Sequence, residues 1–201
     1  MSKIAVVYYS STGHVHQLAT AIQAGAESAG AEVRLRRASE LAPEAVIRGQ
    51  DAWHAHYVAT KDIVPEATND DLDWADGIAI GSPTRYGLPS AQLKQFLDQT
   101  GPLWGAGKLA DKVATSFTSS QNMHGGQEST ILAMNNVFYH WGTIIVPPGY
   151  TDPLLFAAGG NPYGSSYPSG NEGPEGIPAA YLTAAEYQGR RLAEYAAKLT
   201  A

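Results

Sequence analysis

The chain has 201 residues, of which 44% are hydrophobic, and a formal net charge of -6 at neutral pH. These values suit one domain, residues 1–201, with a core of ordinary size, and they exclude a disordered or fibrous protein. The acidic balance argues against a nucleic-acid partner, because phosphate neutralisation needs clustered Lys and Arg. The sequence contains no cysteine, which excludes disulfide bonds, zinc–thiolate sites and a cysteine nucleophile.

No targeting or membrane segment is visible in the sequence. The first residues lead directly into a predicted strand, without the apolar region of a signal peptide. The longest apolar stretches are far shorter than the roughly 20 residues that a membrane-spanning helix needs. We therefore expect a cytoplasmic protein without stable membrane insertion.

Short apolar segments alternate with segments of helical periodicity along most of the chain. Residues 3–9 are β-branched and aromatic with almost no polar alternation, which is typical of a buried parallel strand. Apolar residues then recur at helical spacing over 14–29, and Gly30 marks the predicted end of that helix. The other predicted elements are strands at 31–38, 76–83, 112–119 and 143–146 and helices at 43–48, 88–99, 127–141 and 179–199. Residues 49–75 and the Gly- and Pro-rich segment 147–178 show no clear pattern.

This alternation of strands and helices predicts an α/β fold with a mostly parallel sheet. Five strands fit the flavodoxin-like order 2-1-3-4-5, which gives a three-layer α/β/α sandwich. In such a sheet the ligand lies beyond the carboxyl ends of the strands. The loops that follow the first, third and fourth predicted strands are therefore the candidate binding loops.

The first of these loops, Ser10-Ser11-Thr12-Gly13, leads straight into a predicted helix. A helix N-terminus presents unpaired N–H groups and a positive dipole end, so it can bind an anion without Lys or Arg. The hydroxyls add donors, and Gly13 lets the backbone approach a bound group closely. Neither a Walker motif nor G-x-G-x-x-G is present, so the loop suits a terminal monophosphate. The alternative is an ordinary helix cap without a ligand.

The other two loops are rich in hydrogen-bonding groups. In residues 83–87, PTRYG, the backbone amides and Thr84 can bond a flat heterocycle, and Tyr86 supplies an aromatic wall. Residues 118–127, TSSQNMHGGQ, can line the edge of a bound ring with amides. Each loop alone is also explained as a polar surface turn. Three such loops at one edge of the sheet favour a binding site.

Five strings in the chain carry a resemblance to a known family: YYSSTGH, GSPTRYG, FLDQTGPLW, GGQE and IIVPPGY. In this order and at these spacings, the chain resembles the WrbA family of flavodoxin-like NAD(P)H:quinone oxidoreductases over almost its whole length. The resemblance implies FMN as the cofactor and NADH or NADPH as the electron donor. It implies two-electron reduction of quinones to hydroquinones by hydride transfer through the flavin. It also implies a homotetramer in which neighbouring subunits complete the active site.

The resemblance further implies roles for individual residues. The phosphate of FMN would be held by Ser10, Thr12, Gly13, His14 and Val15. The other cofactor contacts would be Pro83, Thr84, Arg85, Tyr86, Gly87, Thr118, Ser119, Gln121, Asn122, Gly125 and Gly126. His140 matches a position that lies against the flavin, and we predict that it is catalytic. Trp104 matches an aromatic residue of the nicotinamide and quinone pocket, to which Thr12 would also contribute.

Two other functions stay open at this point. A flavodoxin-type one-electron carrier would use the same FMN site to pass electrons to protein partners. A flavoprotein that binds a transcription regulator is suggested by the family's older name, tryptophan repressor-binding protein, although no DNA-binding element is visible. His54 and His56 would share a face in an extended segment and could then bind a metal, but no carboxylate ligand stands at a set spacing, so we expect no metal.

Overall fold

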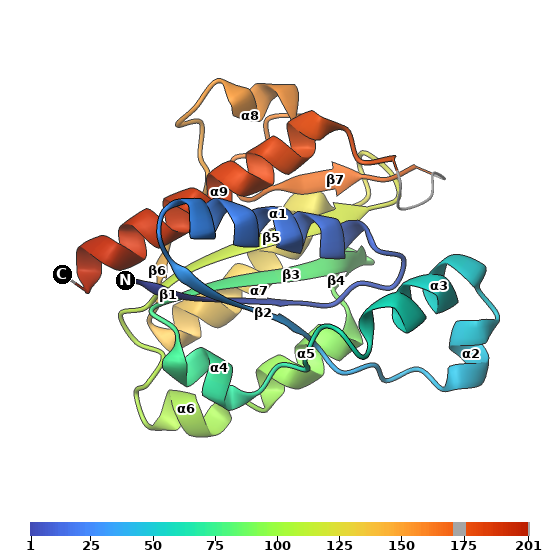
Figure 1. Cartoon of the computed structure of the whole chain (residues 1–201), viewed down its shortest axis with the longest axis horizontal. Coiled ribbons are helices and arrows are strands. Elements are labelled where there is room, and N and C mark those ends of the chain that lie inside the picture. Colours follow the sequence, from blue (N-terminus) through green and yellow to red (C-terminus); the bar gives the residue numbers. More distant parts are fainter. Residues whose placement is uncertain (171–175, 201) are drawn as a thin grey trace.

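The computed structural model describes residues 1–170 and 176–200, and it shows a central sheet covered by helices on both faces (Figure 1). The strands are β1 (Lys3–Tyr8), β2 (Glu32–Arg37), β3 (Gly77–Arg85), β4 (Leu88–Pro89), β5 (Val113–Ser120), β6 (Ile144–Ile145) and β7 (Ser166–Pro168). The helices are α1 (His14–Ser28), α2 (Glu44–Arg48), α3 (Asp51–Thr60), α4 (Asn69–Trp74), α5 (Ala91–Asp98), α6 (Gly101–Gly105), α7 (Gln127–Trp141), α8 (Leu154–Ala157) and α9 (Ala179–Leu199).

The main strands follow the order β2-β1-β3-β5-β6, and all of these pairs are parallel. This is the predicted order 2-1-3-4-5, because the short strand β4 only forms a hairpin with β3. The predicted fold class is therefore confirmed. Within the described residues the sheet has seven strands rather than five, since β4 and β7 add to the predicted set.

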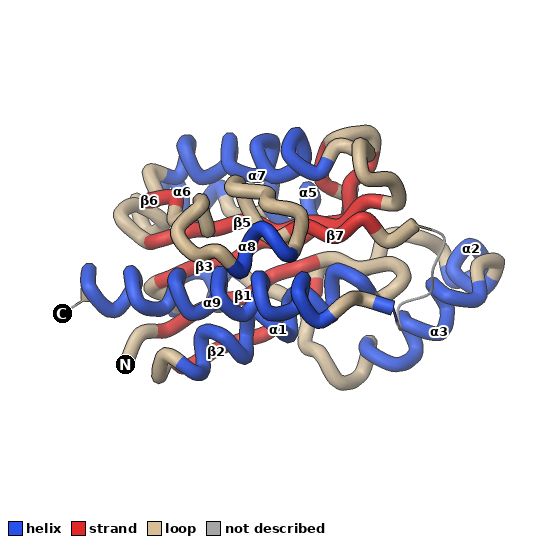
Figure 2. Tube along the Cα trace, turned by 90° about the horizontal axis from the view of Figure 1, so that it is seen from above, coloured by secondary structure: helices blue, strands red, loops and turns tan. Residues whose placement is uncertain are grey.

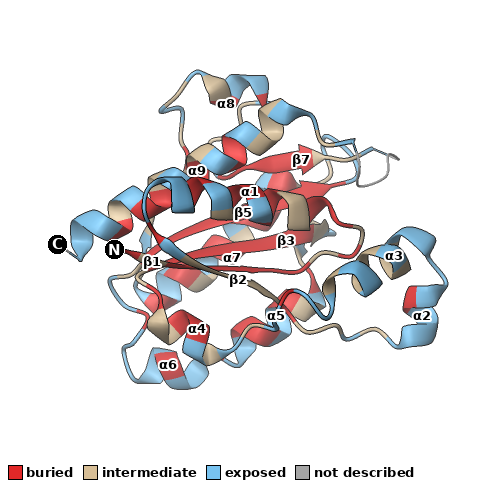
Figure 3. Ribbon diagram, in the orientation of Figure 1, coloured by how far each residue is buried: buried red, intermediate tan, exposed pale blue. Residues whose placement is uncertain are grey.

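Two apolar cores lie on the two faces of the sheet. Figure 2 shows α1 and α9 on one side and α5, α6 and α7 on the other. Ile4, Val6 and Tyr8 of β1 pack toward α1 and α9, whereas Ala5 and Val7 pack toward the opposite helices. Figure 3 shows that buried residues fill the central strands and the inner faces of the helices. Burial on both faces explains why the sequence of β1 is an unbroken apolar run.

Helices α1 and α9 are in backbone contact at two glycines. A Cβ atom on Gly25 would lie 1.9 Å from the carbonyl oxygen of Glu186, and one on Gly189 would lie 2.0 Å from that of Ile22. Only glycine fits at either position without a shift of the helices. This contact holds α1 on the sheet, with its N-terminus at the carboxyl end of β1.

The fifth strand is interrupted, which the sequence analysis did not predict. β6 pairs with the first two residues of β5, and β7 pairs with its last three. Between them, the Gln188 side chain from α9 donates to Thr115 Oγ1 at 2.6 Å and to the Ser116 carbonyl at 2.9 Å, and it accepts from the Ser165 amide at 2.7 Å. Residues 147–165 thus leave the sheet and return to it; of the predicted segment 147–178, positions 171–175 lie outside the described residues.

Two segments differ from their predicted form. The predicted helix 88–99 begins at Ala91, because Leu88–Pro89 pair with the end of β3 and Ser90 caps the helix. The unassigned segment 49–75 contains α3 and α4.

His54 and His56 lie on the helix α3, so they do not meet the extended condition for sharing a face. In the part of the chain that the structure describes, no group of three or more His, Cys, Asp or Glu is placed to hold a metal. Over the same residues, no helix is long and apolar enough to span a bilayer.

Candidate cofactor site

A cleft of about 770 Å³ opens at the carboxyl edge of the sheet, where the three predicted loops meet. The predicted residues that line it are Thr12, His14, Pro83, Thr84, Arg85, Tyr86, Ser119, Gln121, Asn122 and Gly125. The lining residues outside the predicted set are Ser11, Gln50, Ala52, Ser120, Ser169 and Gly170. The structure therefore brings the three loops together and adds two walls, one from the start of α3 and one from the end of β7.

The first loop leaves the N-terminus of α1 open toward the cleft. Gly13 occupies the cap position with φ 100°, and its amide donates to Ser10 Oγ at 3.0 Å. No side chain in the described chain caps the helix, and its first turn holds no acidic residue. The amides of a first helical turn have no partners within the helix. The first turn, which begins with His14 and Val15, is thus arranged to receive an anion.

The second loop is a tight hairpin that presents Tyr86 to solvent. Tyr86 and Gly87 join β3 to β4 as a two-residue turn with φ values of 56° and 79°, the pattern of a type I′ turn. A positive φ is uncommon for a bulky residue and points to function. Beside this turn, the Arg85 guanidinium donates to Ser11 Oγ at 3.2 Å and joins the second loop to the first.

The third loop packs directly on the second. A Cβ atom on Gly126 would lie 2.9 Å from the Cα atom of Gly87, so the two backbones touch at glycines. Thr84 Oγ1 also lies 2.8 Å from Thr130 Oγ1 on α7. These contacts fix the separation of the two loops, and Gly87, Thr118 and Gly126 support the cleft without lining it.

Residues 169–170 extend the wall that the third loop forms. The Ser169 amide donates to the Ser120 carbonyl at 2.7 Å, and the Gly170 amide donates to the Gln121 carbonyl at 2.8 Å. The sequence carried no signal for this wall, because it depends on β7 pairing with β5. The signal for the Gln50 and Ala52 wall was equally absent, since α3 has no buried apolar face.

The structure places His140 and Trp104 away from the cleft of their own chain. Helix α7 begins at the third loop, and its 15 residues span about 22 Å before it ends beside β6, at the opposite edge of the sheet (Figure 1). His140 lies in that last turn, and its carbonyl accepts a hydrogen bond from Trp104 Nε1 at 2.8 Å. These two predicted residues are therefore together, but they do not join the other site residues within one chain.

Histidines lie beneath the first loop. Tyr8 Oη lies 2.5 Å from His16 Nδ1, and the His16 and His56 rings have centroids 5.4 Å apart. Burial, reinforced by the neighbouring His16 and His14, lowers the pKa of His56 to about 4, and burial also lowers the pKa of His16. Both rings are neutral at pH 7, so they pack as uncharged groups rather than acting as acids.

The groups that line the cleft fit a phosphorylated, flat and polar ligand. An open helix N-terminus with three adjacent hydroxyl residues suits a phosphate, and the amide-rich third loop suits the edge of a heterocycle. The described lining contains Arg85, whose positive charge attracts an anion. The fold and this site together define a flavodoxin-like, FMN-binding protein.

Comparison with known proteins agrees with this class. Residues 2–152 match the family model described as NADPH-dependent FMN reductase. The chain is 50% identical over 164 residues, 82% of each chain, to an NAD(P)H dehydrogenase (quinone) from Deinococcus radiodurans. It is 42% identical over 203 residues, 99% of each chain, to one from Sinorhizobium fredii.

Solved structures give the same result. A flavodoxin described as a WrbA-like protein, from Agrobacterium tumefaciens, has a TM-score of 0.66 at 26% identity, and the match covers 98% of this chain and 99% of that one. A flavodoxin from the domain Archaea, at 19% identity, shares the fold with a TM-score of 0.62 and 97% and 99% coverage. The chain belongs to the WrbA-like family of NAD(P)H:quinone oxidoreductases, so the resemblance seen in the sequence is confirmed.

Proposed function

We propose that this protein, as one domain of residues 1–201, is an FMN-dependent NAD(P)H:quinone oxidoreductase. The observation that carries the proposal is the cleft, in which an uncapped helix N-terminus faces an amide-rich loop at the carboxyl edge of the sheet. The relatives named NAD(P)H dehydrogenase (quinone), which match almost the whole chain, support the same reaction. FMN, when bound, accepts electrons from NAD(P)H and delivers them as a pair to the quinone.

The residues of the three loops bind different parts of FMN. The first loop and the first turn of α1, from Ser10 to Val15, hold the phosphate. The segment Pro83–Gly87 lies along the ring, and the exposed Tyr86 side chain forms a wall for the ring or for the second substrate. Residues from Thr118 to Gly126 bond the polar edge of the ring.

The charge of the cleft favours the two-electron enzyme over a one-electron carrier. Adding an electron pair brings negative charge to the cleft, which Arg85 and the third-loop amides stabilise. The described lining offers no carboxylate to oppose that charge. The regulator-binding alternative has no specific structural observation in its favour.

We also propose a homotetramer in which Trp104 and His140 act at the cleft of a neighbouring subunit. Trp104 is 58% exposed and lies at the edge of the sheet opposite to the cleft, so only another copy can bring it to a bound flavin. The same holds for His140, for which we propose a catalytic role as a donor of a proton or of positive charge. A cytoplasmic location stays a prediction of the sequence.

Under anaerobic conditions, protein reconstituted with FMN is expected to turn over NADH or NADPH continuously only when benzoquinone is added, with one hydroquinone formed per nicotinamide consumed. Anaerobic absorbance spectroscopy of the nicotinamide, with the hydroquinone product measured in parallel, checks this result. The FMN-free protein is the control. Transfer of single electrons to a protein acceptor, without quinone reduction, would favour the carrier instead.

Oligomers that contain subunits of two inactive variants are expected to regain quinone reductase activity. Trp104→Ala removes the aromatic residue, and Gly13→Val weakens FMN binding in its own subunit, so the assay is run at an FMN concentration that fills only the intact clefts. In a co-expressed mixture, an intact FMN cleft can meet an intact Trp104 from a neighbour. Quinone reductase activity above the sum of the two parents is expected, and activity no higher than that sum would contradict a role in trans.

A further inference from the structure

The wall of the cleft formed by Gln50 and Ala52 belongs to a two-helix arm, defined here as residues 43–60. Its helices α2 and α3 pack on each other, and Ile47 of α2 is buried. No side chain of α3 is fully buried, and the half-buried His56 contacts the His16 ring of α1. Apolar burial therefore does little to hold α3 in place, although its first turn lines the cofactor cleft.

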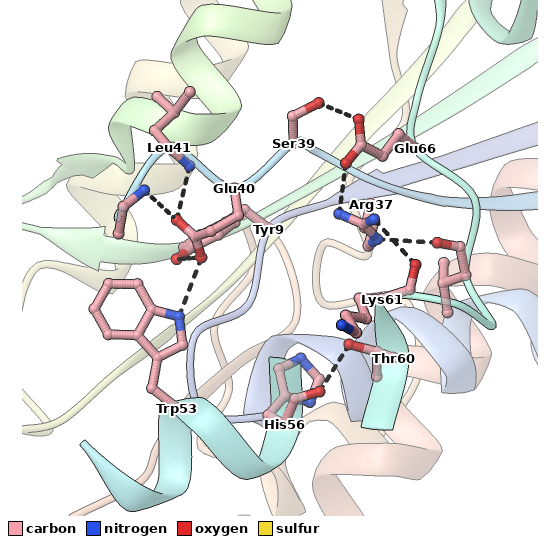
Figure 4. Close-up of polar contacts among 12 residues, drawn as sticks. Tyr9, Arg37, Ser39, Glu40, Leu41, Trp53, His56, Thr60, Lys61 and Glu66 are labelled. Atoms are coloured by element: carbon pink, nitrogen blue, oxygen red, sulfur yellow. Dashed lines mark hydrogen bonds and ion pairs between the residues drawn. The ribbon is translucent and has the colours of Figure 1, made fainter. Parts of the chain in front are cut away.

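One carboxylate joins this arm to the body of the protein. Glu40, in the loop after β2, accepts hydrogen bonds from Trp53 Nε1 of α3 at 3.1 Å and from Tyr9 Oη at 2.8 Å (Figure 4). It also accepts from Gln92 Nε2 of α5 at 2.9 Å. The backbone amides of Leu41 and Ala42 donate to the same carboxylate at 2.8 and 2.9 Å.

Five donors saturate the acceptor capacity of this carboxylate, which has about four lone-pair sites. Burial alone would raise the pKa of Glu40, but the hydrogen bonds from the Ala42 and Leu41 amides and from the Gln92 and Tyr9 side chains hold that pKa below its usual value. Glu40 is thus ionised at neutral pH, and its bonds to the indole, phenol and amide groups are charge-assisted.

The Glu40 contact lies beside the residues of the arm that line the cleft. Trp53 directly follows Ala52, so the indole is held one residue from the cleft wall. Arg37 holds the segment that directly follows the arm, because its guanidinium donates to the Lys61 and Val64 carbonyls at 3.1 and 3.0 Å (Figure 4). Releasing Trp53 would leave α3 attached at its C-terminal end and free to move at its first turn.

We propose that Glu40 is a positioning residue, which holds the first turn of α3 against the cofactor cleft through Trp53. Glu40 itself does not line the cleft. The inference rests on the proposed function for the identity of the cofactor, FMN. Its effect appears in the mobility of the arm and in the retention of FMN.

Glu40→Gln tests this role, because it keeps the shape of the side chain but removes its charge and places an NH₂ group among five donors. Amide hydrogen exchange in residues 50–56 is expected to become about tenfold faster, whereas exchange in α7 stays unchanged. The Kd for FMN, measured by flavin fluorescence, is expected to rise about tenfold. Glu44→Gln is the matched control, since this carboxylate lies on the arm but pairs only with Arg48 within α2.

A double-mutant cycle separates positioning from a general loss of stability. Trp53→Phe removes the single indole donor and is expected to weaken FMN binding in the same direction. Both changes disrupt the Trp53–Glu40 hydrogen bond, through which the proposed positioning acts. The double variant should therefore bind FMN no more weakly than whichever single variant binds it more weakly. Additive losses, or faster exchange throughout the protein, would overturn the positioning role.

The same measurements keep this inference distinct from the proposed function. If Glu40→Gln shows the same amide exchange and the same FMN affinity as the wild type, the inference is wrong. Quinone reduction by the wild type would still support the proposed function. Wild-type protein that binds FMN without reducing quinone would overturn the function, and the Glu40 effects on the arm would still be measurable.

Discussion

Valine at position 13 is expected to weaken FMN binding by about 10- to 100-fold while the protein still folds. Gly13 has φ 100° at the cap of α1, a conformation that a β-branched residue adopts only with strain. In the valine variant, backbone strain of about 1–3 kcal/mol displaces the first loop from its binding conformation. Restoring that conformation when the phosphate binds costs the same free energy, which weakens FMN binding. The Kd for FMN by fluorescence titration and the unfolding midpoint of the FMN-free protein check the two parts of this prediction.

Gly30→Val is the matched control for Gly13→Val. Gly30 has φ 81°, and a Cβ atom there would meet nothing within 4 Å, so its substitution brings similar backbone strain far from the cleft. Both variants should lose similar stability, but only the first should lose FMN. Equal FMN affinity in the two variants would show that the turn at Gly13 does not hold the phosphate.

The free energy of unfolding is expected to fall as the pH drops from about 6.5 to about 4, and His56 should contribute up to about 3 kcal/mol of that loss. Burial, with His16 and His14 nearby, lowers the pKa of His56 to about 4 in the folded protein. The unfolded chain therefore binds the proton first, so protonation favours unfolding within this window. Urea titrations at pH 7.5, 6, 5 and 4.5 check the slope.

Two histidines of one helix provide the comparison for this pH effect. His56→Gln should flatten the loss of stability between pH 6.5 and 4, because it removes the group that must stay neutral. His54→Gln should leave the loss in place, since His54 lies on another face of α3. A pH profile that is unchanged in His56→Gln would assign the effect to other groups, with His16 the first to test.

Much of the fold could be predicted because strong local patterns coincide with the global structure. The apolar run of β1, the periodic stripe of α1 and the unbroken strand β3 each have a sequence signal that matches their burial. The sheet order then follows from the alternation of strands and helices. The three loops that meet at the cleft were predicted for the same reason, since each follows a strand whose end is visible in the sequence.

The features that the sequence did not reveal depend on contacts between distant residues. Gln188 completes the outer side of β5 from a helix that begins more than 50 residues later along the chain. The turn at Tyr86 requires positive φ from a residue that rarely adopts it, so the helix predicted over 88–99 began too early. The arm has no apolar face in α3, and the hydrogen bond from Trp53 to Glu40 links its first turn to a loop that is distant in the sequence.

The interruption of the fifth strand places the residues that stabilise the sheet and the residues that shape the cleft in different segments of the chain. Both ends of the 147–165 excursion are connected to β5. One end is connected through β6, and the other through β7 and the side-chain amide of Gln188. Apart from Leu155 and Ala158, which pack on α9, its interior can therefore change in length or composition while the sheet keeps its register. Because β7 leads directly to Ser169 and Gly170, evolution could reshape one rim of the cleft by exchanging this excursion and leave the phosphate turn untouched.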